Sequence, residues 1–227
     1  MAGTGPGKCL LVTGPPVYKI RYGWISIFFA MKGVGKTTLI MRVLDMMRMR
    51  MGMGMGMRGL SNPNLKIQGF YTQEMRERRG GQRVGFQVVT LDGRTSLLAS
   101  STVSSQESMT SWPSVGKYKV DIASFESIAL PELQVKEDTH LFIIDEVGKM
   151  EMFSPSFFPA VLKVLESNIP LLASIPSPKS GRDLPGAVAR LKNQPGVTII
   201  NLSESNRDSM KRHIFDVLSG WLHNGNQ

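Results

Sequence analysis

The 227-residue sequence has one cysteine, no apolar run long enough to span a bilayer and no segment typical of a secretory signal. Because Cys9 has no partner within the chain, a disulfide-stabilised scaffold is excluded and a reducing compartment is favoured. The longest apolar candidate, Trp24 to Met31, is far shorter than the roughly 20 residues of a membrane helix. The N-terminus lacks a basic region followed by an apolar core and a cleavage site. These absences predict a cytoplasmic protein, with a nuclear location left open and no membrane partner.

Acidic residues are scarce in the first part of the chain. Residues 1–94 carry 15 basic and 4 acidic side chains, a net charge of +11, whereas the remainder carries −2. Two segments, residues 17–32 and 46–58, contribute +3 each. Without them the net charge falls from +9 to +3, so the basic balance is local and gives little support for a nucleic-acid partner.

Hydrophobic periodicity predicts strands that alternate with helices. The predicted strands are 8–13, 68–73, 84–91, 140–145, 170–175 and 197–202, and the predicted helices are 37–47, 124–133, 157–167, 184–193 and 206–222. Arg79-Gly80-Gly81-Gln82 indicates a hairpin, and the Ser/Thr-rich residues 95–116 are predicted to form a loop. This alternation predicts one α/β domain over residues 1–227, with a doubly wound, mainly parallel sheet and helices on both faces.

Two stretches do not fit this pattern. Residues 17–32 contain five of the chain's 17 aromatic residues and no acidic residue, with neither helix nor strand periodicity. Residues 46–58 hold seven of the 15 methionines in an alternating Met-Arg and Met-Gly run, typical of a simple-sequence expansion. We interpret the second stretch as a low-complexity extension of a helix and loop, with a Met-rich binding face as the alternative.

The run Gly33-Val34-Gly35-Lys36-Thr37-Thr38, placed at the start of a predicted helix, is the second half of a phosphate-binding loop, the Walker A motif. Successive backbone N–H groups at a helix N-terminus form a nest for phosphate oxygens. Lys36 would reach the β- and γ-phosphates, and the Thr37 hydroxyl would bind Mg²⁺. The motif also requires an earlier glycine, but Ala30 stands at that position.

The missing first half lies upstream. Thr13-Gly14-Pro15-Pro16 ends the first predicted strand, and joining it directly to Gly33 completes the strand–loop–helix motif. Residues 17–32 are therefore an insertion within the phosphate-binding loop. They begin with valine and end with lysine, whose codons permit a GT…AG boundary, so a retained intron and a genuine structural insertion both stay open.

His140-Leu-Phe-Ile-Ile-Asp145-Glu146 supplies the second signal, a Walker B motif. An apolar strand would deliver Asp145 to its carboxyl edge, where the carboxylate can hold Mg²⁺. Glu146 is then placed to deprotonate the attacking water. We expect Gly14 and Asp145 to end neighbouring strands of the sheet, at the edge where ligands bind.

The chain resembles the thermophile-type nucleoside-triphosphatase family, to which animal cancer-related nucleoside-triphosphatases belong. Beyond the two motifs, the matching segments are Gly69-Phe-Tyr-Thr-Gln-Glu74, Val84-Gly-Phe-Gln-Val-Val-Thr-Leu91, Val115-Gly-Lys-Tyr118, Ile144-Asp-Glu-Val-Gly-Lys-Met-Glu151, Ile175-Pro-Ser-Pro-Lys179 and Glu204-Ser-Asn-Arg207. The resemblance implies a P-loop NTPase fold and Mg²⁺-dependent hydrolysis of ATP, GTP, CTP and UTP to the diphosphate and phosphate. A monomer is favoured.

Two further residues are candidate nucleotide contacts. Lys149 follows the acidic pair closely enough to face the γ-phosphate, with a surface role as the alternative. Arg207 lies at the start of the last predicted helix and could contact nucleotide. The alternative is that this segment only starts the helix, with Asn206 as the helix cap. At the level of the whole protein, a small nucleotide-dependent kinase and a catalytically impaired nucleotide- or RNA-binding module are the other hypotheses.

Deleting residues 17–32 is expected to raise the rate of nucleoside triphosphate hydrolysis. The insertion replaces a tight turn between strand and helix by a long excursion, and small misplacements of reacting groups can cost about 10²-fold in rate. Phosphate release at saturating Mg²⁺-GTP compares the full chain, the deletion variant and the deletion variant carrying Lys36→Ala. Equal rates for the full chain and the deletion variant would show that the insertion is a tolerated loop.

Overall fold

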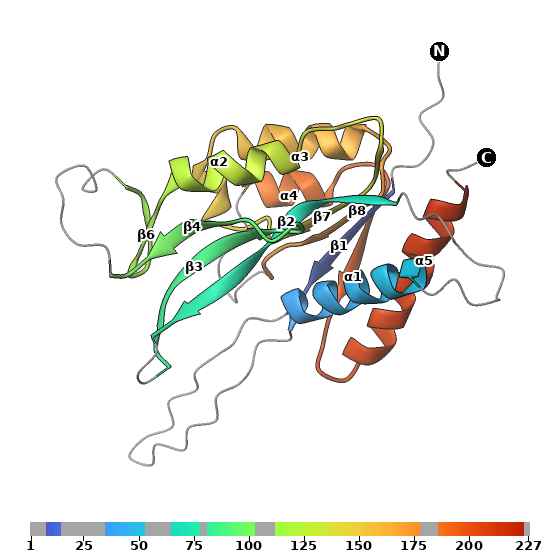
Figure 1. Cartoon of the computed structure of the whole chain (residues 1–227), viewed down its shortest axis with the longest axis horizontal. Helices are drawn as coiled ribbons and strands as arrows, with labels where there is room; N and C mark the ends of the chain where they lie inside the picture. The colour runs from blue at the N-terminus through green and yellow to red at the C-terminus, as the bar shows by residue number, and fades with distance from the viewer. Residues whose placement is uncertain are drawn as a thin grey trace.

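The computed structural model describes residues 8–14, 35–52, 65–77, 81–102, 112–177 and 186–224, which fold around one nine-stranded sheet (Figure 1). Along the sheet the strand order is β5-β6-β4-β3-β2-β7-β8-β1-β9. The strands are β1 (Cys9–Thr13), β2 (Lys66–Arg76), β3 (Arg83–Thr90), β4 (Thr95–Ser100), β5 (Ser114–Val115), β6 (Tyr118–Val120), β7 (Thr139–Asp145), β8 (Leu171–Ser174) and β9 (Val197–Asn201). The helices are α1 (Lys36–Gly52), α2 (Ile122–Glu132), α3 (Phe157–Glu166), α4 (Gly186–Lys192) and α5 (Arg207–Asn224), with one 3₁₀ turn, η2 (Glu151–Phe153).

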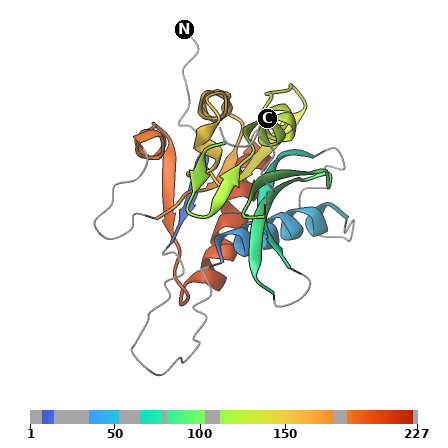
Figure 2. The same cartoon turned by 90° about the vertical axis from the view of Figure 1, so that its left-hand side faces the viewer.

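The sheet has a parallel half and an antiparallel half. Strands β2, β7, β8, β1 and β9 pair in parallel, as the alternation of strands and helices predicts. Strands β3, β4, β6 and β5 extend the sheet by antiparallel pairing, and Figure 2 views the molecule from this side. The predicted hairpin between β2 and β3 is confirmed by their antiparallel register. The α/β fold class is confirmed, with an antiparallel part larger than the one hairpin predicted.

The prediction of a loop over residues 95–116 is wrong at both ends of that range. Residues 95–100 form β4, and residues 114–115 form β5. Leu98 and Ala99 of β4 are fully buried, so tertiary packing overrides the low strand propensity that the serine content indicates. Residues 103–111 lie outside the described residues.

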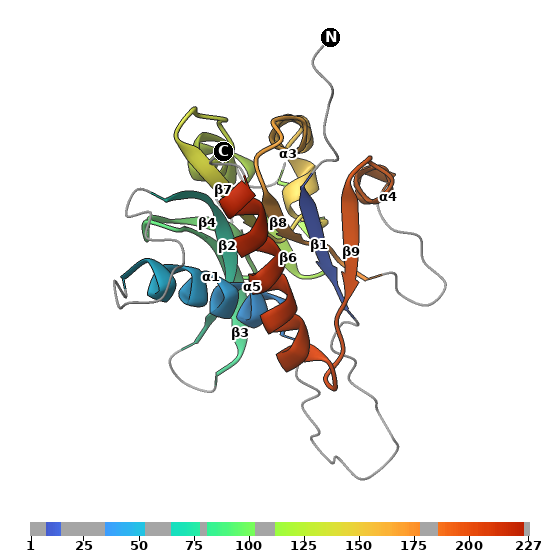
Figure 3. The ribbon, with the colours of Figure 1, turned by 90° about the vertical axis from the view of Figure 1, so that its right-hand side faces the viewer.

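The side chains of each central strand alternate between two cores. Cys9 and Leu11 of β1 face the core beneath α2, α3 and α4, whereas Leu10 and Val12 face the core beneath α1 and α5. Figure 1 shows these helix groups on opposite faces of the sheet, and Figure 3 shows α1 and α5 together on one of them. Helices therefore cover both faces, as predicted.

The carboxyl ends of β1 and β7 meet the same edge of the sheet, but they are not neighbours. Strand β8 lies between them and pairs in parallel with each. The expectation that Gly14 and Asp145 end neighbouring strands is therefore wrong in detail, because strand order is fixed by tertiary contacts that neither motif encodes. The common edge, on which the functional argument depends, is confirmed.

Neither anomalous stretch is fully described. Residues 17–32 lie outside the described residues, as do 53–58 of the Met-rich run. The first part of that run continues α1 to Gly52, with Met47 buried against the sheet and Met49 exposed. Over the described ranges, no helix combines the length and hydropathy needed to cross a membrane.

Replacing Gly69 by alanine is expected to destabilise the sheet strongly. Gly69 on β2 has φ +126°, and a Cβ there would lie 1.8 Å from the Ile143 carbonyl oxygen on β7. Gly93→Ala is the matched control, because Gly93 also has a positive φ (+93°) but no neighbour within 4 Å of the added carbon. Backbone strain alone costs about 1–3 kcal/mol. In urea unfolding, Gly69→Ala should lower the free energy of unfolding by more than about 4 kcal/mol. Equal decreases for the two variants would contradict the prediction.

Candidate functional site

The described part of the phosphate-binding loop consists of its two ends. Strand β1 leads into Gly14, where an added Cβ would lie 2.7 Å from the Leu202 carbonyl oxygen. Leu202 N also donates a 2.6 Å hydrogen bond to Thr13 O, so backbone from beyond β9 closes on the end of β1. At the other end Gly35 has φ +78°, and α1 begins at Lys36. The predicted phosphate contacts Pro15, Pro16, Gly33 and Val34 lie outside the described residues.

Lys36 connects the start of α1 to the ends of two strands. Its Nζ donates a 2.9 Å hydrogen bond to Ile175 O, just after β8, and lies 3.3 Å from Glu146 Oε2, just after β7. The Lys36 side chain is 18% exposed and that of Glu146 is 33% exposed, so the ion pair is only partly screened by water. Thr37 is partly buried and Thr38 is exposed.

Asp145 is a buried acid at the end of β7. Its carboxyl Oδ1 accepts a hydrogen bond from Ser174 Oγ, and its Oδ2 is buried with no hydrogen-bond partner among the described residues. Burial raises the pKa of Asp145 to about 6, although the hydroxyls of Ser174 and Thr37 and the charge of Lys36 oppose that rise. A carboxylate oxygen buried without a partner is costly unless a cation or donor completes it.

A second buried acid, Glu151, was missed by the analysis of the sequence. An added Cβ at Gly148 would lie 2.8 Å from Glu146 Oε1 and 2.9 Å from Glu151 Oε2, so both carboxyl groups lie close to the backbone of this turn. Burial, and next the charge of Glu146, raise the pKa of Glu151 to about 8. The residue stands in the segment that carries the family resemblance, but its residue type alone does not indicate burial.

Arg207, the first residue of α5, packs against the phosphate-binding loop. Its Nη1 would lie 3.4 Å from a Cβ added to Gly35, and its Nε is buried without a partner among the described residues. Asn206 stands directly before α5, at the position of the proposed cap, and its carbonyl oxygen accepts a 2.9 Å hydrogen bond from Met210 N in the first turn. Its Oδ1 accepts from Ser203 N at 2.8 Å, which fixes the turn before the helix.

Two other basic residues are exposed and make no hydrogen bond or ion pair with Lys36, Asp145 or Glu146. Lys149 is exposed on the turn after β7 and makes no hydrogen bond or ion pair within the described part of the chain. Arg76 is exposed on the hairpin, where it donates to Gly81 O and pairs with Glu74. This contact pattern is that of a solvated hairpin face.

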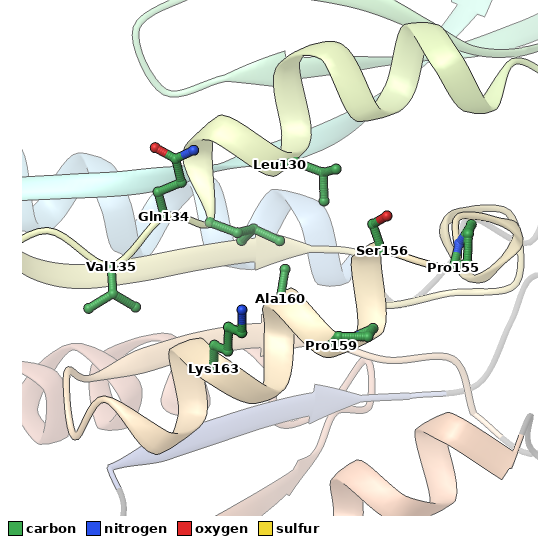
Figure 4. A pocket seen from close by; sticks show the side chains of 9 residues that line it. Leu130, Gln134, Val135, Pro155, Ser156, Pro159, Ala160 and Lys163 are labelled. Carbon is green, nitrogen blue, oxygen red and sulfur yellow. The ribbon is translucent and has the colours of Figure 1, made fainter.

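A separate groove lies between α2 and α3 (Figure 4). Its lining is mostly apolar and includes Leu130, Leu133, Pro155, Pro159, Ala160 and Lys163. None of the predicted phosphate-binding or acidic site residues lines this groove. It is therefore distinct from the edge formed by β1, β8 and β7.

A lysine at the start of a helix, in a Gly-Lys-Thr motif, and a buried acid at the end of a parallel strand are typical of a P-loop NTPase. The solved structure of THEP1 from Aquifex aeolicus is 28% identical and has a TM-score of 0.64, covering 92% of this chain and 98% of that one. The solution structure of a human cancer-related nucleoside triphosphatase is 30% identical and has a TM-score of 0.65, covering 94% and 98% of the two chains. The P-loop NTPase fold is thereby confirmed.

Sequence comparison identifies the family. The model of a family described as NTPase matches residues 27–215. The nucleoside-triphosphatase THEP1 of Thermotoga petrophila is 35% identical over 188 residues, which cover 82% of this chain and 88% of the relative. The cancer-related nucleoside-triphosphatase homolog of Mus musculus is 37% identical over 194 residues, covering 82% and 92%. The chain belongs to the NTPase family, whose enzymes hydrolyse nucleoside triphosphates.

The family match begins inside residues 17–32, after β1. In the structure, however, β1 is an integral strand, paired with β8 on one side and β9 on the other. The sheet is therefore completed by residues that precede the match, consistent with a phosphate-binding motif interrupted between Gly14 and Gly33.

The free energy of unfolding should depend on pH through Glu151. Its pKa rises from 4.5 to about 8 on folding, so between these values the folded state binds more protons and stability falls as pH rises. Glu151→Gln replaces the titrating carboxyl group by an amide that does not titrate. Between pH 5 and pH 8 the free energy of unfolding of the parent, measured with urea, should fall by on the order of 3 kcal/mol more than that of the variant. Parallel pH profiles for the two proteins would show that Glu151 is ionised in the folded state.

Proposed function

We propose that this nucleoside-triphosphatase requires Mg²⁺, accepts ATP, GTP, CTP and UTP, and uses Lys36, Asp145 and Glu146 as its catalytic residues. The observation that carries the proposal is the meeting of these three side chains at one sheet edge. Lys36 Nζ lies 3.3 Å from Glu146 Oε2, and Asp145 directly precedes Glu146 at the end of β7. Lys36 belongs to one sequence motif and the acidic pair to the other, so their meeting supports a single site built from both motifs.

The residues present fit a magnesium ion bound together with substrate phosphates. Thr37 and Asp145 offer hydroxyl and carboxylate oxygen, the ligand type that Mg²⁺ prefers. The buried, unpartnered Oδ2 of Asp145 supports this assignment. In sites of this kind Mg²⁺ is usually held by one or two protein ligands together with substrate phosphates. When bound, the ion neutralises charge that develops on the phosphate oxygens.

The remaining roles follow from charge and position. The predicted phosphate contacts are the residues of the two loop halves, with Lys36 reaching the β- and γ-phosphates. They are Gly14, Pro15, Pro16, Gly33, Val34, Gly35, Thr37 and Thr38. The Arg207 guanidinium beside Gly35 supplies a second positive charge, and the exposed Lys149 contacts the γ-phosphate when nucleotide is bound. These contacts serve the triphosphate, which all four nucleotides share, and this supports broad tolerance of the base.

Hydrolysis then needs an activated water. Its oxygen forms a new bond to the γ-phosphorus while the bond from that phosphorus to the β–γ bridging oxygen breaks, releasing nucleoside diphosphate and phosphate. Glu146 accepts the proton that the water loses. Its carboxylate is partly exposed beside Lys36, so it is open to water and stays close to the transferring group.

Glu146→Gln is expected to lower kcat by about 10²–10⁴-fold with little change in KM, because the water loses its proton acceptor. Asp145→Asn should instead raise the Mg²⁺ concentration needed for half-maximal turnover. Phosphate release is measured over Mg²⁺ and nucleotide concentrations for ATP, GTP, CTP and UTP. Glu166→Gln, an exposed acid-to-amide change at the end of α3, is the control. Parent-like kcat in Glu146→Gln would reject Glu146 as the base, and an unchanged Mg²⁺ requirement in Asp145→Asn would reject Asp145 as the metal ligand.

A further inference from the structure

Strand β8, inserted between β1 and β7, brings a hydroxyl to the catalytic edge. Its last residue, Ser174, is fully buried and donates a hydrogen bond from Oγ to Asp145 Oδ1. The parallel register pairs Ala173 with Ile144, which brings Ser174 level with Asp145, and pairs Ser174 with Val12 on the other side. Neither sequence motif includes this serine, and its position depends entirely on the strand order.

We propose that Ser174 is a positioning residue that fixes the carboxylate of Asp145 for Mg²⁺. This inference rests on the proposed function, in which Asp145 holds the metal. With Oδ1 occupied by the serine hydroxyl, rotation of the carboxylate is restricted and Oδ2 remains the oxygen without a protein partner. Mg²⁺ demands near-ideal octahedral geometry, so a ligand of fixed orientation binds it better than a rotating one.

The residues after Ser174 contact the side of the site where the phosphates are proposed to bind. Ile175 O accepts the hydrogen bond from Lys36 Nζ at 2.9 Å. The hydroxyl of Ser177 lies 3.0 Å from that of Thr13, at the end of β1. The exit from β8, residues 174–177, thus contacts the metal-binding acid, the phosphate-binding lysine and the strand that leads into the phosphate loop. This gives the segment starting Ile175-Pro-Ser a role at the site that its composition does not indicate.

A purely structural serine would behave differently from a positioning one. Losing a buried hydrogen bond lowers stability by about 1–3 kcal/mol wherever it occurs. A positioning role also changes the affinity for Mg²⁺, and residues that orient metal ligands typically alter it by about 10–100-fold. A variant that keeps the hydroxyl should preserve that affinity.

The test is a Mg²⁺ titration of Ser174→Ala and Ser174→Thr. Binding of a fluorescent, non-hydrolysable GTP analogue is followed at equilibrium as Mg²⁺ is added, and kcat and KM for GTP are measured in parallel. Ser219→Ala is the control, since Ser219 is also buried but contacts Met47 between α5 and α1. Asp145→Asn is titrated beside them.

We expect Ser174→Ala to raise the Mg²⁺ concentration for half-maximal analogue binding by about tenfold, with Ser174→Thr within about threefold of the parent and Ser219→Ala unchanged. Parent-like Mg²⁺ affinity in Ser174→Ala, with Asp145→Asn impaired, would overturn the role of Ser174 alone. Parent-like affinity in Asp145→Asn would overturn the proposed metal site itself. If Ser174→Ala does not fold, Ser174→Cys, whose thiol is a weaker donor, takes its place with the same expected direction.

Discussion

The proposed chemistry of this protein depends on keeping one carboxylate, that of Asp145, buried at the edge of the sheet. Removing an isolated charge from water costs several kcal/mol unless polar groups and opposite charge compensate it. Here the compensation comes from the Ser174 hydroxyl, the Thr37 side chain and the charge of Lys36. These groups belong to β8 and α1, which are distant from β7 in the sequence. The order of the strands is therefore as important to the site as the identity of its residues.

The two motifs could be located from the sequence because each joins a short apolar run to a chemically distinctive residue. The end of β1 at Thr13 and of β7 at Asp145 agree with the predicted strands, since a buried strand stops where polar groups must reach the edge. The prediction failed for β4, where burial of Leu98 and Ala99 outweighs a Ser/Thr-rich composition. It also failed to separate β1 from β7, because pairing between distant strands has no local signature.

Ser174 and Glu151 show why the rest of the candidate site could not be predicted. Serine and glutamate are common residues, and both become informative only through burial beside another acid. The carboxyl group of Glu151 lies, with that of Glu146, close to the backbone of the turn at Gly148. Arg207, in contrast, was a candidate from its place at a helix start, and its guanidinium does lie against Gly35. The phosphate contacts Pro15, Pro16, Gly33 and Val34 remain predictions.

The packing of α5 on the same face of the sheet as α1 has a consequence for the order in which the site is completed. Strand β1 is held between β8 and β9, and its exit contacts Leu202, only a few residues before α5. Arg207 then closes on the helix start at Gly35. During synthesis the ribosome therefore releases Lys36 and the acidic pair well before Leu202 and Arg207. A nascent chain halted before β9 would contain both sequence motifs. It would lack the contacts of Leu202 with the end of β1 and of Arg207 with Gly35.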